Sequence, residues 1–162
     1  MTRAWATIDT PLGELVLEGD ERGLTAVRLP NLPRPDLDPA RRDPDALAGA
    51  LSQVEEYFAG RRREFDLPLA PAGGDFDLRV WRETSAIPYG ETISYGALAR
   101  AVGRPRGARE VGGAMARNRI PIIVPCHRVV GSDGALVGYA GGLERKRALL
   151  DLEAGRPQAS LW

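Results

Sequence analysis

The sequence predicts an α+β fold in which a small α/β domain over residues 1–75 precedes a helical domain over residues 76–162. Strand-like alternation is confined to the first third, and helical spacing of apolar residues dominates the second half. The net charge of zero hides a change of sign, because residues 1–75 carry nine arginines and 14 acidic residues (−5) and residues 76–162 carry 13 basic and eight acidic residues (+5). The boundary is placed near residue 75, after a linker-like stretch of proline, alanine and glycine over 68–74.

In the first domain we expect three strands, a helix and a fourth strand. Short alternating runs separated by turn residues predict strands over 4–9, 14–18 and 24–29, and a proline-rich loop over 30–39 follows. A helix capped by Asp45, running to Ala59 and stopped by Gly60, is indicated by apolar residues at spacings of three and four. These residues are Leu47, Leu51, Val54 and Phe58. Residues 64–69 are typical of one more strand.

The second domain is expected to begin with three helices, of which the last two form a helix-turn-helix. The first covers 75–87, the second is capped by Ser94 and runs to Val102, and the third covers 106–117. Gly112 and Gly113 each cost about 1 kcal/mol of helix stability relative to alanine, which favours a close approach of some other molecule to that backbone. A helical hairpin packed for structure alone is the alternative.

The last third is expected to continue with an extended run over 120–130, a tight turn over 131–134 and a flexible loop over 138–142. A final helix over 143–154 has apolar Leu149, Leu150 and Leu152 and is stopped by Gly155.

Composition excludes several classes of protein. Hydrophobic residues make up 43% and charged residues 27% of the chain, as in soluble globular proteins, and no apolar run approaches the roughly 20 residues of a membrane helix. With no secretory signal at the N-terminus, we expect a cytoplasmic protein. One cysteine permits no intramolecular disulfide and no multi-thiolate metal site, and we expect no metal and no cofactor. Seven arginines and one acid between Arg100 and Arg128 indicate an anionic partner such as nucleic acid, or else a solvated surface.

The only cysteine and the only histidine are neighbours, Cys126 and His127. A thiol with an ordinary pKa of about 8.5 is a weak nucleophile at neutral pH, and an adjacent base raises its thiolate fraction. Neighbours on an extended strand point to opposite faces, so a local bend or a bridging water is needed to couple them. The alternative is a buried structural cysteine beside a structural histidine. The third group that orients the histidine would be one of the acids after residue 127: Asp133, Glu144, Asp151 or Glu153.

Three further residues have both a functional and a structural reading. Asn118, at the end of the third helix, can fix the following turn. Tyr95, at the start of the second, can cap, pack or donate to a substrate nitrogen. Arg109 can contact phosphate or enter a base stack, although a solvated arginine is more common.

A series of short motifs covers residues 76–155: Ile87 to Thr92, Ser94-Tyr95, Ala108-Arg109, Val111 to Met115, Asn118, Ile123 to Val130, Tyr139 and Gly141 to Leu143. Together they resemble the signature of the O6-alkylguanine-DNA alkyltransferases, the methylated-DNA–protein-cysteine methyltransferases. The N-terminal half resembles the family's α/β domain only loosely. The resemblance implies a ribonuclease-H-like N-terminal domain and a winged helix-turn-helix C-terminal domain. It also implies a suicide DNA repair protein that flips O6-alkylguanine, and O4-alkylthymine, out of the duplex.

The resemblance also implies a role for each site residue. Cys126 would take the alkyl group, and His127, oriented by Glu153, would accept the thiol proton through a water. Asn118 would brace the active-site turn, and Tyr95 would hydrogen-bond the guanine ring. Residues with implied roles at DNA are Arg109, which would fill the gap in the stack, and Ala108 and Gly112, which would let the helix sit close to DNA in the minor groove. The pocket would be walled by Tyr139, Met115, Gly138 and Ala140.

Two positions depart from the family pattern: Arg119 stands where a proline is common, and Ala140 where many relatives have serine. The partner implied is double-stranded DNA containing O6-alkylguanine, with no membrane involved. The protein would be a monomer, and cooperative binding along DNA is left open. A lesion-binding protein of the same fold without transfer, a Cys-His hydrolase and a redox-sensing thiol are the alternative functions.

Overall fold

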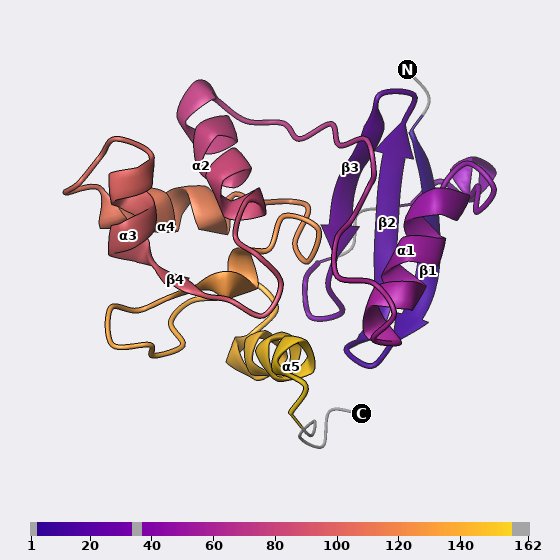
Figure 1. The fold of residues 1–162 in the computed structure, drawn as a ribbon. Helices are drawn as coiled ribbons and strands as arrows, with labels where there is room; N and C mark the ends of the chain where they lie inside the picture. The colour runs from indigo at the N-terminus through magenta and orange to yellow at the C-terminus, as the bar shows by residue number, and fades with distance from the viewer. Residues whose placement is uncertain (1–2, 34–36, 157–162) are drawn as a thin grey trace.

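The computed structural model describes residues 3–33 and 37–156, which form two domains lying side by side (Figure 1). The N-terminal domain consists of a three-stranded sheet and a helix, and the C-terminal domain consists of helices joined by long loops. Buried residues of both domains belong to one continuous hydrophobic core. Part of the expected proline-rich loop, residues 34–36, lies outside the described residues.

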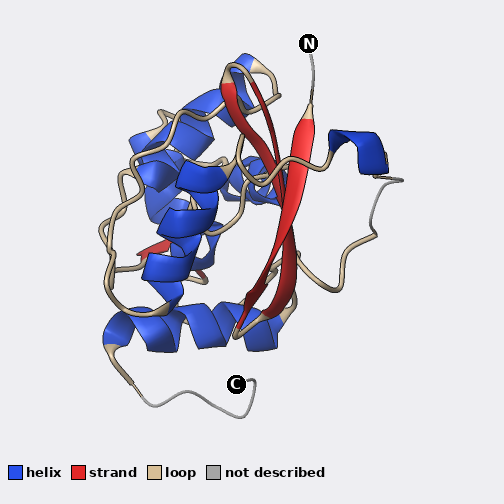
Figure 2. Ribbon diagram, turned by 90° about the vertical axis from the view of Figure 1, so that its right-hand side faces the viewer, coloured by secondary structure: helices blue, strands red, loops and turns tan. Residues whose placement is uncertain are grey.

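The three strands predicted in the first domain are confirmed. They are β1 (Ala4–Thr10), β2 (Gly13–Asp20) and β3 (Gly23–Arg28), paired antiparallel in the order β1-β2-β3. The central strand is buried on both faces from Leu15 to Gly19, and α1 (Ala48–Phe58) lies across one of these faces (Figure 2). The short 3-10 turn η1 (Pro39–Arg41) lies on the other side.

Two expectations for this domain are wrong. Helix α1 is capped by Leu47 and begins at Ala48, three residues after Asp45, because the preceding segment forms turns in which Asp43 accepts a hydrogen bond from the backbone of Ala46. Residues 64–69 form no strand: a single parallel bridge joins Leu69 to Leu24. A ladder cannot continue through Pro68, which has no N–H to donate.

The linker passes very close to β3. Gly23 has φ +143°, and a Cβ there would lie 2.3 Å from the carbonyl oxygen of Pro68. Only glycine fits this position, and the contact holds the linker against the sheet edge.

The C-terminal domain contains the expected helix-turn-helix. The helix-turn-helix consists of α3 (Tyr95–Ala101) and α4 (Ala108–Ala116), and α2 (Asp75–Ser85) packs on both of them. The Ser94 hydroxyl accepts a hydrogen bond from the backbone of Ala97 at 3.0 Å, so the predicted cap of α3 is confirmed.

The expected extended run over 120–130 is wrong. The chain turns tightly, with the backbone of Val124 donating to Ile120 at 2.9 Å and Ile122 at φ +75°, and then forms the 3-10 turn η2 (Cys126–Arg128). Only β5 (Val129–Val130) is extended, paired parallel with β4 (Ile93–Ser94). Residues 120–125 are all buried, so their apolar, β-branched composition reflects burial on every side and not a strand.

Helix α5 (Leu143–Ala154) ends at Gly155 in the left-handed conformation, as predicted. It lies below the other helices and also reaches the N-terminal domain, where Arg145 donates to the carbonyl of Leu12 at 3.1 Å (Figure 1). The face that it buries carries Lys146, Leu149 and Glu153. Within residues 3–33 and 37–156, no helix is long and apolar enough to cross a bilayer.

Candidate active site

Cys126 opens onto a cavity of about 250 Å³ between α4, the turn before Cys126 and the loop before α5. The cavity brings together residues that the sequence placed at the site from distant segments. They are Tyr95, Gly112, Met115, Asn118, Cys126, Gly138, Tyr139 and Ala140, joined by Ala116 and Pro121. Most of the lining surface is apolar, which suits a flat, hydrophobic ligand with a few polar edges.

Asn118 holds the turn that presents the thiol. Its side-chain amide donates to the carbonyl of Val124 at 3.1 Å, and its side-chain oxygen accepts from the backbone of Ile120 at 3.0 Å. Arg119 does not disturb this turn: its carbonyl accepts a hydrogen bond from Val27 of β3 at 2.8 Å. The turn is therefore fixed from within by Asn118 and from outside by the N-terminal domain.

The environment of Cys126 keeps its sulfur protonated. Burial raises the pKa of the thiol above its ordinary value, whereas a hydrogen bond from Asn118 and the positive charge of Lys146 act in the opposite direction. Because burial outweighs both, the group is a thiol at neutral pH and needs a base to become a nucleophile.

His127 lies in the same 3-10 turn, completely buried, so the local bend considered at the sequence level is present. Its Nε2 lies 2.7 Å from Oε2 of Glu153, and its Nδ1 has no hydrogen-bond partner among the described residues. Burial lowers the pKa of His127 below its ordinary value although the Glu153 carboxylate raises it, so the imidazole is neutral at pH 7. A neutral ring that donates through Nε2 has a free lone pair on Nδ1.

Of the four candidate acids, the structure brings Glu153 to His127. Arg128 forms a bidentate ion pair with the Glu153 carboxylate. Its Nε donates to Oε1 at 2.8 Å, and its Nη2 donates to Oε2 at 2.9 Å. The hydroxyl of Tyr57, on α1, donates to Oε2 at 2.6 Å. Burial alone raises the pKa of Glu153, but the hydrogen bonds from His127 and Arg128 outweigh it and hold that pKa well below its ordinary value. The carboxylate is therefore ionised, and both of its oxygens accept hydrogen bonds.

Sequence reasoning missed the parts played by Tyr57, Arg128 and Lys146. Lys146 is fully buried, and its ammonium donates to the carbonyls of Val129, Val137 and Gly138 at 2.7 to 3.2 Å. Its signal was present in the sequence, since it is the one lysine in a chain with 21 arginines. Arg128 follows the Cys-His pair directly, whereas nothing in the sequence connects Tyr57 with Glu153.

The loop that closes the cavity is held at three points. The hydroxyl of Tyr95 donates to the carbonyl of Val137 at 3.1 Å, the same carbonyl that accepts from Lys146. Asn31 of the N-terminal domain donates to the carbonyl of Ala140 at 3.0 Å. Gly138 has φ +59°, and a Cβ there would lie 3.8 Å from the Tyr95 hydroxyl. The loop geometry thus depends on both domains.

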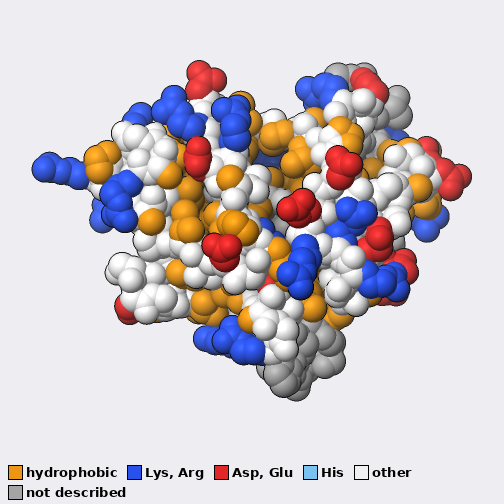
Figure 3. Space-filling view, in the orientation of Figure 1, with side chains coloured by type: hydrophobic (Ala, Val, Ile, Leu, Met, Phe, Trp, Pro, Cys, Tyr) orange, Lys and Arg blue, Asp and Glu red, His pale blue; other side chains and the backbone are white. Residues whose placement is uncertain are grey.

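The two remaining predicted residues, Ala108 and Arg109, lie outside the cavity, exposed on the first turn of α4. Arg109 lines a shallow hollow with Arg104 and Arg117. Arg104 is paired with Glu110, and Arg117 with Asp77. In the space-filling view, lysine and arginine side chains gather over the C-terminal domain, and acidic side chains are more frequent over the N-terminal domain (Figure 3).

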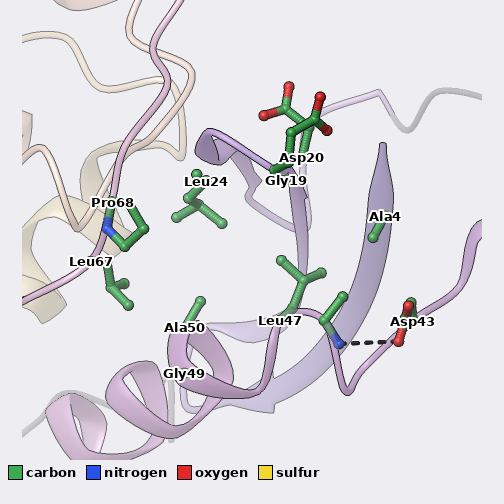
Figure 4. A pocket seen from close by; sticks show the side chains of 13 residues that line it. Ala4, Gly19, Asp20, Leu24, Asp43, Leu47, Gly49, Ala50, Leu67 and Pro68 are labelled. Carbon is green, nitrogen blue, oxygen red and sulfur yellow. Dashed lines mark hydrogen bonds between the residues drawn. The ribbon is translucent and has the colours of Figure 1, made fainter. Parts of the chain in front are cut away.

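A larger cavity, of about 550 Å³, lies in the N-terminal domain between the β2–β3 hairpin, α1 and the linker (Figure 4). Two of its acidic side chains already have partners: Asp20 binds Arg22, and Asp43 binds the backbone of Ala46. No nucleophile or histidine lines it. Across residues 3–33 and 37–156, moreover, no three acidic, histidine or cysteine residues are grouped to hold a metal ion. The chemistry is therefore concentrated at Cys126.

Comparison with known proteins agrees with this geometry. Residues 4–71 match the family described as 6-O-methylguanine DNA methyltransferase, ribonuclease-like domain, and residues 75–155 match its DNA binding domain. The chain is 49% identical to the methylated-DNA–protein-cysteine methyltransferase of Mycobacterium tuberculosis over 97% of this chain and 96% of that protein. It is 43% identical to the constitutive enzyme of Bacillus subtilis, over 92% and 94%.

Among solved structures, the fold matches the crystal structure of Mycobacterium tuberculosis OGT in complex with DNA. The TM-score is 0.87 at 46% sequence identity, covering 98% of this chain and 97% of that one. The two family matches together span nearly the whole chain. This protein therefore belongs to the 6-O-methylguanine DNA methyltransferase family.

Proposed function

We propose that this protein repairs double-stranded DNA by transferring the alkyl group of O6-alkylguanine, and of O4-alkylthymine, to Cys126, once per molecule. The observation that carries the proposal is the position of the only thiol in the chain. It opens onto a cavity of about 250 Å³ and begins the short turn η2, whose next residue is a buried histidine bound to a carboxylate. The relatives named methylated-DNA–protein-cysteine methyltransferase support the reaction, and the likeness to a DNA complex supports the partner.

The proton is the first requirement of the reaction. The Cys126 thiol gives its proton to Nδ1 of His127 through one water, and the sulfur then attacks the alkyl carbon. The neighbouring Glu153 carboxylate, 2.7 Å from Nε2, stabilises the positive charge that develops on the imidazole. Because Nδ1 is the free nitrogen of a neutral ring, the base is ready at neutral pH.

The leaving group is the second requirement. As the carbon–sulfur bond forms, the bond between that carbon and O6 of guanine breaks, and its electron pair stays on the guanine. Tyr95 lines the cavity and already donates to a carbonyl, so its hydroxyl is placed to donate to a ring nitrogen instead. In the balanced reaction the thiol proton replaces the alkyl group on guanine. The thioether is not hydrolysed, so the protein is consumed.

The DNA side of the proposal rests on α4. Gly112 lines the cavity, and a Cβ there would meet no atom within 4 Å, so the protein's own packing does not require a glycine. A small residue is instead explained if the DNA backbone approaches the helix at this point, with Ala108 beside it. Arg109, exposed on the same turn, fills the space that the flipped nucleotide leaves in the stack.

The decisive experiment incubates the protein with a duplex containing O6-methylguanine and measures the mass of the peptide that contains Cys126. We expect a gain of one methyl group and one repaired guanine per protein molecule. Cys126→Ala should bind the duplex and repair nothing. The experiment also tests the alternatives: unmodified peptide with retained binding would indicate a lesion-binding protein, and product in molar excess over protein would indicate a hydrolase.

Four parts of the expectation stay predictions. They are the roles of the individual site residues, the monomeric state with cooperative binding on DNA left open, the cytoplasmic location and the domain boundary near residue 75.

A further inference from the structure

The hydroxyl of Tyr57 connects the N-terminal domain to the proposed proton acceptor. Tyr57 lies on the buried face of α1, and its side chain is completely buried. Its hydroxyl donates to Oε2 of Glu153 at 2.6 Å, although the two residues are 96 positions apart in the sequence. This is the shortest of the hydrogen bonds that the carboxylate accepts.

Oε2 of Glu153 is shared among three donors. They are the Tyr57 hydroxyl at 2.6 Å, Nε2 of His127 at 2.7 Å and Nη2 of Arg128 at 2.9 Å. Oε1 accepts from Nε of Arg128 at 2.8 Å and faces the backbone N–H of Gly90 at 3.4 Å. Because an ionised carboxylate can only accept hydrogen bonds, the histidine donates through Nε2, and its Nδ1 is left as the acceptor.

Other charged and titratable groups also face this pair. Tyr89 lies near Glu153 from the loop after α2, with Arg63 and Arg128 over its ring. The positive charge of Lys146 on α5 lowers the pKa of His127, and the negative charge of Glu153 raises the pKa of Tyr139. Among the described residues only Tyr57, His127 and Arg128 bind Oε2 directly through side-chain hydrogen bonds.

We propose that Tyr57 is a positioning residue for alkyl transfer: its hydroxyl fixes the Glu153 carboxylate and, by sharing Oε2 with His127, limits how strongly the imidazole holds a proton. The proposal rests on the proposed function of Cys126 and His127. A donor at Oε2 withdraws negative charge from the acceptor that His127 uses, because the hydrogen bonds to one oxygen compete. Tyr57 thus acts in the same direction as burial, which lowers the pKa of His127 below its ordinary value.

The direction of the effect follows from this competition. In Tyr57→Phe the carboxylate retains its charge and loses one donor, so it stabilises the protonated imidazole more strongly, and the pKa of His127 rises. Since only the neutral ring accepts the thiol proton, the acid limb of the rate profile moves to higher pH. We expect a shift of about 0.5 to 1 pH unit, roughly half of the 1–2 units of one hydrogen bond to a charged group, because Tyr57 acts on His127 only through Glu153.

Transfer is measured as a single-turnover rate constant with free O6-benzylguanine between pH 5 and 9, which removes DNA binding from the comparison. The matched control is Tyr89→Phe, which removes a hydroxyl from the same aromatic cluster, where Tyr89 and Tyr57 are 6.2 Å apart between ring centres. No side-chain hydrogen bond joins the Tyr89 hydroxyl to Glu153 in the described structure. We expect the control to retain the wild-type acid limb. A Tyr57→Phe profile that falls by the same factor at every pH would indicate a purely structural role and overturn the proposal.

A second readout does not depend on activity. His127 is the only histidine in the chain, so untagged protein gives one imidazole signal whose ¹⁵N shifts report both pKa and tautomer by NMR. We expect the Nε2–H tautomer in the wild type and a higher pKa in Tyr57→Phe. An Nδ1–H tautomer in the wild type would overturn the proposal even if the variant does not fold. The wild type could show the expected tautomer, and Tyr57→Phe the expected rise in the pKa of His127, while Cys126 gains no alkyl group. This result would refute the proposed function, and the NMR data would still establish the coupling between Tyr57 and His127.

Discussion

Replacing Gly112 by alanine should change stability and repair in opposite directions. Gly112 lies inside α4, and a Cβ built there meets nothing within 4 Å, so the methyl group creates no clash in the free protein. Alanine stabilises a helix interior by about 0.5–1 kcal/mol relative to glycine. For a chain of this size, 1 kcal/mol corresponds to roughly 2–4 °C in Tm. We therefore expect Tm to rise by about 1–4 °C.

The effect on repair has the other sign because the same methyl group faces the proposed DNA surface and the edge of the Cys126 cavity. Inserting a methyl group into a close-packed contact costs about 1–3 kcal/mol. That cost lowers the rate constant by about 5- to 150-fold. The assay is single-turnover repair of duplex O6-methylguanine, compared with reaction of free O6-benzylguanine, which needs no close approach of α4 to DNA.

The matched control is Gly49→Ala in the first turn of α1, where a Cβ makes only an ordinary 4.0 Å contact with Leu67. This variant should also gain stability and should keep the wild-type repair rate. The reasoning would be refuted if Gly112→Ala repaired duplex DNA at the wild-type rate. Equal losses on duplex and free base would instead show that the methyl group obstructs the cavity and that close approach of DNA does not explain the glycine.

Three other perturbations test the site. Arg109→Ala should slow repair of duplex DNA at least tenfold and change the rate of reaction with free O6-benzylguanine by less than about twofold, since the side chain acts on the base stack. Equal losses with the two substrates would contradict the role of Arg109 in flipping. Glu153→Gln should cost about 3–5 kcal/mol at pH 7 by leaving Arg128 without its charge partner. Because the pKa of Glu153 is depressed in the folded state, its stabilisation is present above the ordinary value of 4.5 and is lost as pH falls below it. Urea unfolding from pH 7 to pH 3 should therefore show the two proteins converging, and a constant difference would contradict this. Lys146→Met should lower the free energy of unfolding by about 2 kcal/mol or more, because the carbonyls of Val129 and Gly138 lose the ammonium and that of Val137 keeps only the Tyr95 hydroxyl. The exposed Arg147→Met should change it by less than about 0.5 kcal/mol. Similar values for the two variants in thermal unfolding would refute the difference.

Local sequence signals predicted the parts of the fold that local physics controls. The three strands, the Ser94 cap and the end of α5 at Gly155 are confirmed, because alternation, capping chemistry and left-handed glycine act over a few residues. The segment over 120–130 was predicted incorrectly because a buried turn and a buried strand have the same composition. Pro121, Pro125 and the side-chain hydrogen bonds of Asn118 favour the turn over the strand, and the hydrogen bonds exist only once the turn has formed.

The helix α5 illustrates a second limit. Its apolar residues predicted a face of Leu149, Leu150 and Leu152, yet the buried face carries Lys146 and Glu153 around Leu149. Burial of these charges is stable because each has its partners, carbonyls for the lysine and Tyr57, His127 and Arg128 for the glutamate. A pattern based on hydrophobicity assigns such residues to the surface.

The sequence by itself therefore determined which atoms can react. With one thiol and one imidazole in the chain, next to each other, it named Cys126 and His127 and reduced the acids to four. The tertiary structure decided which acid serves the histidine, which nitrogen of the ring stays free, and that a tyrosine from the other domain shares the carboxylate. These choices depend on contacts between residues 26 and 96 positions apart. Periodicity describes only neighbours along the chain, whereas such contacts are set by how the two domains pack into a single core.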